Sequence, residues 1–390
     1  MRAFVGLLLA ATFFLPLPGL ASQTPQKQKL PKPRQLDKEL TCRRDAAGEF
    51  VCAAAAPGAA AASDQPPHGR IITTTRLVPV TCSVFGADGL ALTGLQAEDF
   101  RVYEDGFERR IAVFAAPSAL PAGVALVIDA SPSVLRDAKE MTDAARALMD
   151  VLARQDEVAV LDFSAHTYLQ QGFSSDRDLL SRALARVDVR SLLGDTGGSN
   201  IYAAVYLTAR ELFAKRKGRK AIVLFTDGQD SGFGLTLDPA SAAPQPGIAA
   251  NRLTYEDVMR TLAADDIETF VISTEHRPKI MTPQWLAAHR DATLLTAGAR
   301  KAGIPAYTLY LAEAARRSGG QIHFLREADS LAETFRHIAE RVSAEYLLAF
   351  TPATGNAAPK PGWHRLRVEV VGHAGATAAS RAAYYVPAAQ

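Results

Sequence analysis

The fold of this chain is decided by the stretch Val124-Ala125-Leu126-Val127-Ile128-Asp129-Ala130-Ser131-Pro132-Ser133. Its first five residues are all apolar, which is typical of a strand that is buried on both faces of a parallel sheet. Its last five residues contain one carboxylate and two hydroxyl groups at alternate positions. Because ligands of open α/β sheets bind beyond the carboxyl ends of the strands, the sequence predicts a binding site directly after this strand.

Strand and helix patterns alternate from residue 122 to residue 344. A second fully apolar strand covers Ala221 to Phe225, and strand patterns recur at Val158 to Phe163 and Thr269 to Ser273. Helical patterns lie between them, and a further one covers Ser330 to Ser343, with its apolar residues on one face. The alternation predicts an α/β domain over 122–344, with a doubly wound, mostly parallel sheet and helices on both faces.

Two β-rich segments flank this α/β unit, over residues 71–118 and 345–390. Both carry short strand patterns separated by turns, such as the hairpin turn at Asp105-Gly106. Neither segment is large enough to bury a core of its own. We therefore expect 345–390 to pair with 71–118 in one small β-sandwich, with the α/β unit inserted between them.

The first residues predict a signal peptide over 1–21, because Arg2 precedes an apolar run that ends in small residues before Ser22. The run is shorter than the roughly 20 residues of a membrane-spanning helix, and no later segment is apolar enough to span a bilayer. We therefore expect an exported protein in the periplasm, on the cell surface or in the medium, with no transmembrane segment after cleavage.

The next residues, 22–70, are rich in Pro, Lys, Gln and Ala. They have few large apolar groups to bury, so we expect a linker or a disordered segment. Cys42 and Cys52 flank a short polar stretch, and the sequence leaves open whether a disulfide closes it into a small loop. Cys82 lies on the apolar face of an alternating run, which predicts a buried thiol.

Composition and motifs exclude several classes of function. Lys+Arg 43 against Asp+Glu 41 gives a net charge of +2 without a basic stretch, so nucleic acid is not an expected partner. The sequence has neither the Gly-x-Ser-x-Gly element of serine hydrolases nor the Gly-rich phosphate-binding loop of nucleotide enzymes. Its 8 histidines show no zinc-binding spacing.

Three loops carry oxygen-bearing side chains to the expected edge of the sheet. The first holds Asp129, Ser131 and Ser133. The second is Gly197-Gly198-Ser199-Asn200, before a helical pattern, and the third is Thr226-Asp227-Gly228, after the second apolar strand. Carboxylate and hydroxyl oxygens suit a hard cation such as Mg²⁺. The candidate metal ligands are therefore Asp129, Ser131, Ser133, Ser199 and Asp227.

This arrangement resembles the metal-ion-dependent adhesion site of von Willebrand factor A domains. The pattern of that family is Asp-x-Ser-x-Ser after the first strand, a Thr in a later loop and an Asp after the fourth strand. Asp129 with the two serines that follow it matches the first element, Asp227 matches the last, and Ser199 stands where the Thr is usual. The flanks, at Leu95 to Asp105 and Ala383 to Pro387, are similar to an exported bacterial group labelled VWFA-related.

The resemblance implies a divalent cation, either Mg²⁺ or in its place Mn²⁺ or Ca²⁺, held by the five candidate ligands. It further implies an open coordination position that accepts a carboxylate from an Asp or Glu of a partner protein. The implied function is a divalent-cation-dependent, adhesion-type protein-binding module and not an enzyme.

Two other functions stay open. A metal-assisted phosphohydrolase also places an Asp after a buried strand, but Ser131 stands where its second acid would act. The other is a structural envelope protein with a vestigial metal site, because Ser199 departs from the family pattern. Asp195 and Asp230 lie near these loops, and we interpret them as solvated loop acids in preference to residues that tune the site. Residues 276 to 305 interrupt the alternation, and we interpret them as decoration in preference to a lid or a partner-contacting insertion.

Overall fold

The structure of the chain is a computed structural model that describes residues 29–38, 40–45, 48–54, 77–117, 121–193, 198–214, 216–230, 253–289, 293–325, 331–352 and 360–386. The predicted signal peptide over 1–21, the strand residues from 71 to 76 and Asp195 lie outside these ranges. Within the described ranges, no helix is long and apolar enough to cross a membrane.

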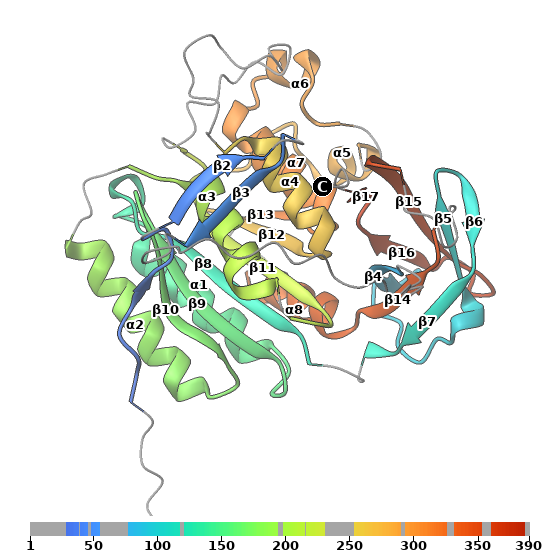
Figure 1. Cartoon of the computed structure of the whole chain (residues 1–390), viewed down its shortest axis with the longest axis horizontal. Helices are drawn as coiled ribbons and strands as arrows, with labels where there is room; N and C mark the ends of the chain where they lie inside the picture. Colours follow the sequence, from blue (N-terminus) through green and yellow to red (C-terminus); the bar gives the residue numbers. More distant parts are fainter. Residues whose placement is uncertain are drawn as a thin grey trace, which may run out of the picture.

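The largest sheet has seven strands in the order β1-β10-β9-β8-β11-β12-β13 (Figure 1). The neighbours from β9 to β13 are parallel, whereas β10 and β1 join at one end as antiparallel strands. The predicted α/β class with a mostly parallel sheet is therefore confirmed. The strands are β1 (Arg34–Gln35), β8 (Gly123–Asp129), β9 (Glu157–Phe163), β10 (Thr167–Ser174), β11 (Lys220–Thr226), β12 (Glu268–Ser273) and β13 (Ile322–Phe324).

Helices cover both faces of this sheet, because the strands send apolar side chains to both sides. In β8, Ala125 and Val127 belong to one core, and Leu126 and Ile128 to the other. The first core is covered by α3 (Ile201–Thr208), α4 (Tyr255–Asp265) and α7 (Ala306–Ser318), and the second by α1 (Ala138–Val151), α2 (Arg177–Leu193) and α8 (Leu331–Ser343).

The segment 276 to 305 forms two short helices, α5 (Pro283–Ala288) and α6 (Ala297–Lys301). Met281 and Leu294 are buried in the same core as α7. This segment is therefore packed onto the α/β unit through its own apolar side chains.

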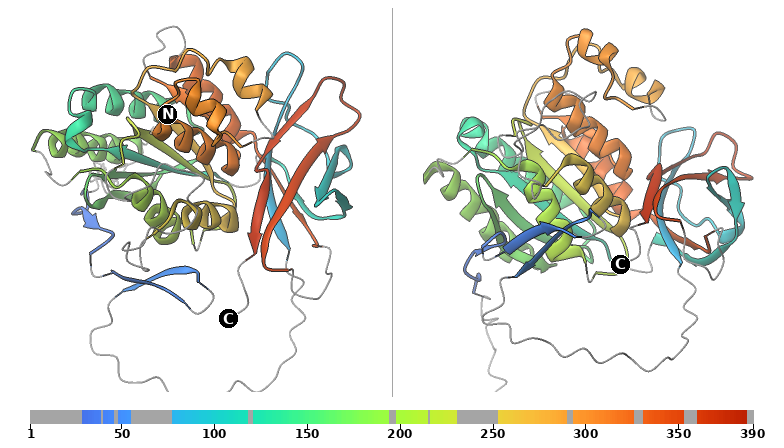
Figure 2. Two further views of the ribbon diagram at one scale, coloured as in Figure 1. Left: turned by 90° about the horizontal axis from the view of Figure 1, so that it is seen from above. Right: turned by 45° about the horizontal axis from the view of Figure 1, so that its top comes forward.

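Two antiparallel four-stranded sheets lie beside the α/β unit, in the orders β16-β4-β14-β7 and β17-β15-β5-β6 (Figure 2). Strand β14 lies between β4 and β7, and β15 pairs with β5, so the segments before and after the α/β unit share both sheets. Cys82 is buried between them as a free thiol, as predicted. The strands are β4 (Val78–Phe85), β5 (Phe100–Glu104), β6 (Phe107–Arg109), β7 (Ile111–Ala115), β14 (Tyr346–Phe350), β15 (Gly362–Val370), β16 (Thr377–Ser380) and β17 (Ala383–Val386).

The part of 22–70 that the structure describes is not a linker. Strands β2 (Leu40–Arg44) and β3 (Phe50–Ala54) form a hairpin, and a disulfide joins Cys42 to Cys52 across it. The linker expectation fails here because it assumed that the segment must bury its own core. Instead Leu36, only 2% exposed, enters the core of the α/β unit, and Phe50 packs its ring 5.5 Å from that of Tyr206.

A buried ion pair holds the sandwich against the base of the large sheet. Arg381, between β16 and β17, lies 3.0 Å from the carboxylate of Asp266 at the end of α4. The same carboxylate accepts a hydrogen bond from the backbone N–H of Thr81 in β4 at 2.9 Å. Because a buried charge without its partner is costly, this pair restricts how the two units can sit together.

Candidate metal centre

The first predicted loop begins where β8 ends. Asp129 is fully buried, and its Oδ1 accepts a hydrogen bond from the backbone N–H of Ser131 at 2.9 Å. This bond is a local turn between an Asp side chain and the backbone two residues on, which favours a sharp bend. Pro132 then opens a short 3₁₀ turn (Pro132–Val134), where its fixed φ suits the first helical position and needs no N–H.

The hydroxyl groups of this loop gather around the Asp129 carboxylate. The Oγ atoms of Ser131 and Ser133 lie 3.0 Å apart, and Ser199 Oγ donates to Asp129 Oδ2 at 3.3 Å. Two ligands at adjacent corners of a Mg²⁺ octahedron are about 3.0 Å apart when each lies about 2.1 Å from the ion. The spacing of the two serine oxygens is therefore that of neighbouring ligands of one small cation.

Asp227 closes the set from the end of β11. Ser133 is hydrogen bonded to its carboxylate, and Oδ1 accepts the backbone N–H of Gln229 at 2.9 Å. Gly228 follows with φ 89°, and a Cβ there would lie 2.9 Å from Leu311. A glycine is therefore required for the turn that aims Asp227 at the other loops. The contacts run without a gap through Ser199, Asp129, Ser131, Ser133 and Asp227.

Negative charge is concentrated at this site. Burial raises the pKa of Asp129 to about 6, and the nearby Asp227 adds to the rise, whereas hydrogen bonds from Ser131 and Thr226 oppose it. Burial also raises the pKa of Asp227. No lysine, arginine or histidine of the described ranges forms an ion pair with either carboxylate. A divalent cation would supply the missing positive charge, so the residues present fit a metal ion.

The donor set is poor in carboxylates and rich in hydroxyls. Within the part of the chain that the structure describes, no group of three or more His, Cys, Asp or Glu side chains could hold a metal. The candidate site has only two such side chains, both aspartates, and its other three candidate ligands are serines. Each of these oxygens is nevertheless a ligand type that Mg²⁺ accepts.

Two residues that position the site were not recognised from the sequence as doing so. Thr226 is fully buried, donates to Asp129 Oδ2 at 2.7 Å and accepts the backbone N–H of Gly228 at 3.0 Å. Asp230 accepts the backbone N–H of Ile201 at 2.7 Å, at the start of α3. The interpretation of Asp230 as a solvated loop acid is therefore wrong. Its contact depends on the chain after Ser199 passing close to β11, which no local pattern reveals.

The loop that carries Ser199 is fixed by its neighbour. The side-chain amide of Asn200 donates to the carbonyl of Ala165 at 2.6 Å, and its backbone N–H donates to the carbonyl of Ser164 at 2.9 Å. Both acceptors lie in the turn between β9 and β10. Ser199 itself is only 3% exposed, so its side chain lies inside the site and does not project into solvent.

Comparisons with known proteins agree with the central part of this architecture. Residues 124–229 match the von Willebrand factor type A domain. No curated protein shows a significant match to the chain.

Several solved structures are similar to part of this chain. BatB of Bacteroides thetaiotaomicron is 18% identical, with 56% of this chain and 98% of that chain covered and a TM-score of 0.38. An aerotolerance-related membrane protein of Bacteroides fragilis is 19% identical, with 57% and 98% covered and a TM-score of 0.38. Proximal thread matrix protein 1 of the mussel byssus, with zinc in its MIDAS motif, is 14% identical, with 61% and 49% covered and a TM-score of 0.38.

Proposed function

Since this chain is a von Willebrand factor A domain protein, with the domain matched over residues 124–229, we propose that it binds a partner protein through a divalent cation. The cation is Mg²⁺ or, in its place, Mn²⁺ or Ca²⁺. It bridges the protein to an Asp or Glu carboxylate of the partner. The proposed ligands are Asp129, Ser131, Ser133, Ser199 and Asp227.

One observation carries this proposal: two buried carboxylates and three hydroxyls form a single connected set without a basic side chain to balance them. Neutral hydroxyl ligands leave much of the charge of a divalent cation uncompensated, so the bound ion attracts a further anion. Ser133 is exposed at the surface and the next large residue, Leu135, is 45% exposed. A partner can therefore reach the site and find an apolar contact beside it.

We also propose that the protein works outside the cytoplasm. The disulfide between Cys42 and Cys52 supports this location, because such bonds persist in oxidising compartments. The predicted signal peptide over 1–21 points the same way.

The proposal is tested with Mn²⁺ as the probe, followed by electron paramagnetic resonance on the full chain. We expect one saturable Mn²⁺ site that Mg²⁺ displaces. Asp227→Asn and Ser133→Ala should each weaken it by at least about tenfold, because each removes or neutralises one ligand. Asp150→Asn, an exposed aspartate on α1, is the matched control and should bind as the wild type does.

A second measurement tests the open coordination position. Acetate added to the Mn²⁺-loaded protein should displace bound water and change the spectrum, whereas acetamide, its neutral analogue, should not. No saturable Mn²⁺ site in the wild type would favour a vestigial site. A Mn²⁺ spectrum that does not change on addition of acetate would indicate a purely structural ion and would contradict the proposed binding mode.

We propose further that the site has no hydrolytic activity. A phosphohydrolase needs a second acid beside its aspartate, and Ser131 occupies that place with a hydroxyl hydrogen bonded within the set. Incubation with p-nitrophenyl phosphate and Mg²⁺ should release no more product than the Asp129→Asn variant does. Turnover that is lost on that substitution would establish an enzyme instead.

A further inference from the structure

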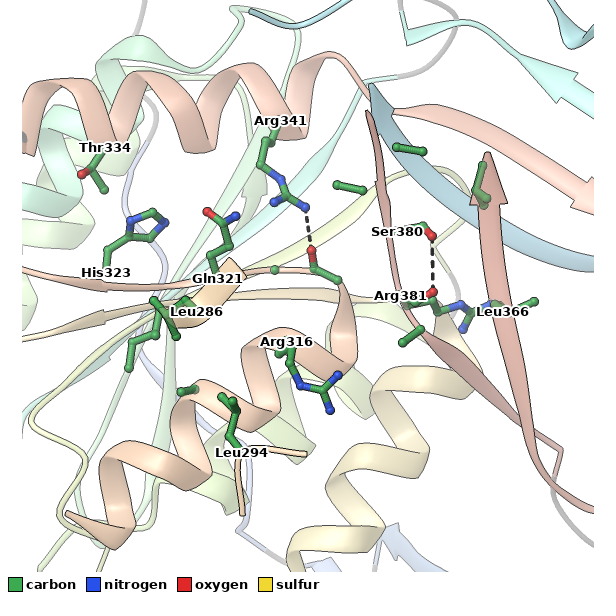
Figure 3. A pocket seen from close by; sticks show the side chains of 18 of the residues that line it. Leu286, Leu294, Arg316, Gln321, His323, Thr334, Arg341, Leu366, Ser380 and Arg381 are labelled. Atoms are coloured by element: carbon green, nitrogen blue, oxygen red, sulfur yellow. Dashed lines mark hydrogen bonds between the residues drawn. The ribbon is translucent and has the colours of Figure 1, made fainter. Parts of the chain in front are cut away.

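A cavity of about 470 Å³ lies where the α/β unit meets the sandwich, away from the candidate metal centre. Its wall comes from the edge strand β13, from helices α7 and α8, and from β15 and β16 of the sandwich (Figure 3). None of the five proposed metal ligands lines it. A volume of this size is within the roughly 300–1,000 Å³ of small-molecule sites.

The charged side chains in the wall of this cavity are basic. Five arginines line it, and none of its lining residues is an Asp or Glu. Four of the five pair with carboxylates of residues outside the lining: Arg316 with Glu313, Arg341 with Glu268, Arg367 with Glu369, and Arg381 with Asp266. The lining itself therefore contributes cationic groups and no carboxylate. The five are Arg277, Arg316, Arg341, Arg367 and Arg381.

Three of the lining side chains have a buried nitrogen atom without a hydrogen-bond partner among the described residues, and one of these, Nε of Arg381, lies 3.0 Å from the carboxylate of Asp266. The other two are Nε2 of His323 and Nε of Arg341. In Figure 3 the side chains of Gln321 and His323 extend from the chain at β13 toward α8, which carries Arg341. Burial is the main cause that lowers the pKa of His323 to about 3, and the positive charges of His337 and Arg341 act in the same direction. An anion would accept a hydrogen bond from the Nε–H of Arg341 and from the neutral imidazole of His323 in the tautomer with its proton on Nε2.

Another part of the wall is apolar. Ile322 and Phe324 come from β13, Leu286 and Leu294 from the α5–α6 segment, and Leu366 from β15. A bare inorganic anion would make no apolar contact with these side chains. An anion with a hydrocarbon body would cover them, because removal of apolar surface from water is favourable.

We propose that this cavity binds a small organic anion, which carries a carboxylate or a phosphate group on an apolar body. The anionic group lies near His323 and Arg341, and the body lies against Ile322 and Leu294. A ligand bound there touches the edge of the large sheet and the sandwich together, so it adds contacts across their junction. This inference is independent of the metal centre.

The test uses isothermal titration calorimetry on the full chain in the presence of a chelator, with octanoate, octyl phosphate and octanol as probes. At least one of the two anions should bind saturably, and at least about tenfold more tightly than octanol, which has the same body without the charge. Comparison of the two anions identifies the preferred head group. Asp227→Asn should bind the anion as the wild type does.

The deciding variant is Gln321→Glu, which places a carboxylate in the wall without a change of shape. Gln321 is exposed, so the fold should tolerate the change. We expect affinity for the anion to fall at least about fivefold through like-charge repulsion. Gln96→Glu, the same change at an exposed site of the sandwich, is the control. Three results would overturn the proposal. Octanol could bind as tightly as the anions, neither anion could bind saturably, or the Gln321→Glu variant could bind the anion as the wild type does.

Discussion

Removal of the Thr226 hydroxyl should weaken the metal centre without removal of any proposed ligand. Thr226→Val keeps the shape of a buried, β-branched strand residue but deletes two hydrogen bonds. One goes to Asp129 Oδ2 at 2.7 Å, and the other comes from the backbone N–H of Gly228 at 3.0 Å. Both bonds end on residues that shape the site, because Asp129 is a proposed ligand and Gly228 makes the turn after Asp227.

The magnitude follows from the charge of the acceptor. A hydrogen bond to an ionised group contributes about 1.5–3 kcal/mol, and loss of the partner leaves the Gly228 N–H unsatisfied. Residues that orient metal ligands in this way typically change metal affinity by about 10–100-fold when replaced. We therefore expect Thr226→Val to lose about 2 kcal/mol of stability and about 10–100-fold of Mn²⁺ affinity.

The assay is Mn²⁺ titration beside urea unfolding, with two companion variants. Thr226→Ser keeps the hydroxyl and should bind Mn²⁺ within about threefold of the wild type, because the hydrogen bond is retained. Thr142→Val removes a buried hydroxyl from α1, which donates to the backbone carbonyls of Ala138 and Lys139. It should reduce stability and leave Mn²⁺ affinity unchanged. Wild-type Mn²⁺ affinity in Thr226→Val would refute the positioning role.

Three further predictions follow from the described contacts. Reduction of the Cys42–Cys52 disulfide, whose cysteines are 10 residues apart, should lower the stability of the β2–β3 hairpin by about 3 kcal/mol. Hydrogen exchange should then be about 100-fold faster over 40–54 and unchanged in the other strands. Gly228→Ala should lose about 2 kcal/mol in urea unfolding and also Mn²⁺ affinity, because φ is 89° and Leu311 blocks the Cβ, whereas Gly172→Ala has open space and should lose neither. In the folded chain the pKa of His323 is lowered to about 3, whereas in the unfolded chain it is about 6.5. As the pH falls below about 6.5 the unfolded chain therefore takes up this proton first, and the free energy of unfolding should fall by up to about 1.4 kcal/mol per pH unit. His323→Asn should lack that slope.

The fold class could be predicted because its signals are local. The apolar strands β8 and β11 have no polar face, and the helices between strands show one apolar face each. The N-terminal hairpin could not be predicted in this way. Its few large apolar side chains, Leu40 and Phe50 among them, pack against another unit, and composition alone counts only what a segment can bury within itself.

In the candidate site, too, some contributions could be predicted from local sequence and others could not. Asp129, Ser131 and Asp227 follow apolar strands, so their place at one edge of the sheet follows from topology. The contribution of Thr226 was hidden because it is the last residue of β11 and resembles any β-branched strand residue. The contact of Asp230 with the start of α3 joins residues that are 29 apart, and only the folded chain brings them together.

The strand order of the sandwich also sets the order in which this chain can fold. β14 occupies the place between β4 and β7, but it is synthesised only after the whole α/β unit. Until it arrives, β4 and β7 each present unpaired backbone groups along an open edge, which is a template for aggregation. We therefore expect the α/β unit to fold before β14 pairs with β4 and β7. Substitutions that slow folding of that unit should reduce the yield of soluble protein even when they leave the finished sandwich untouched.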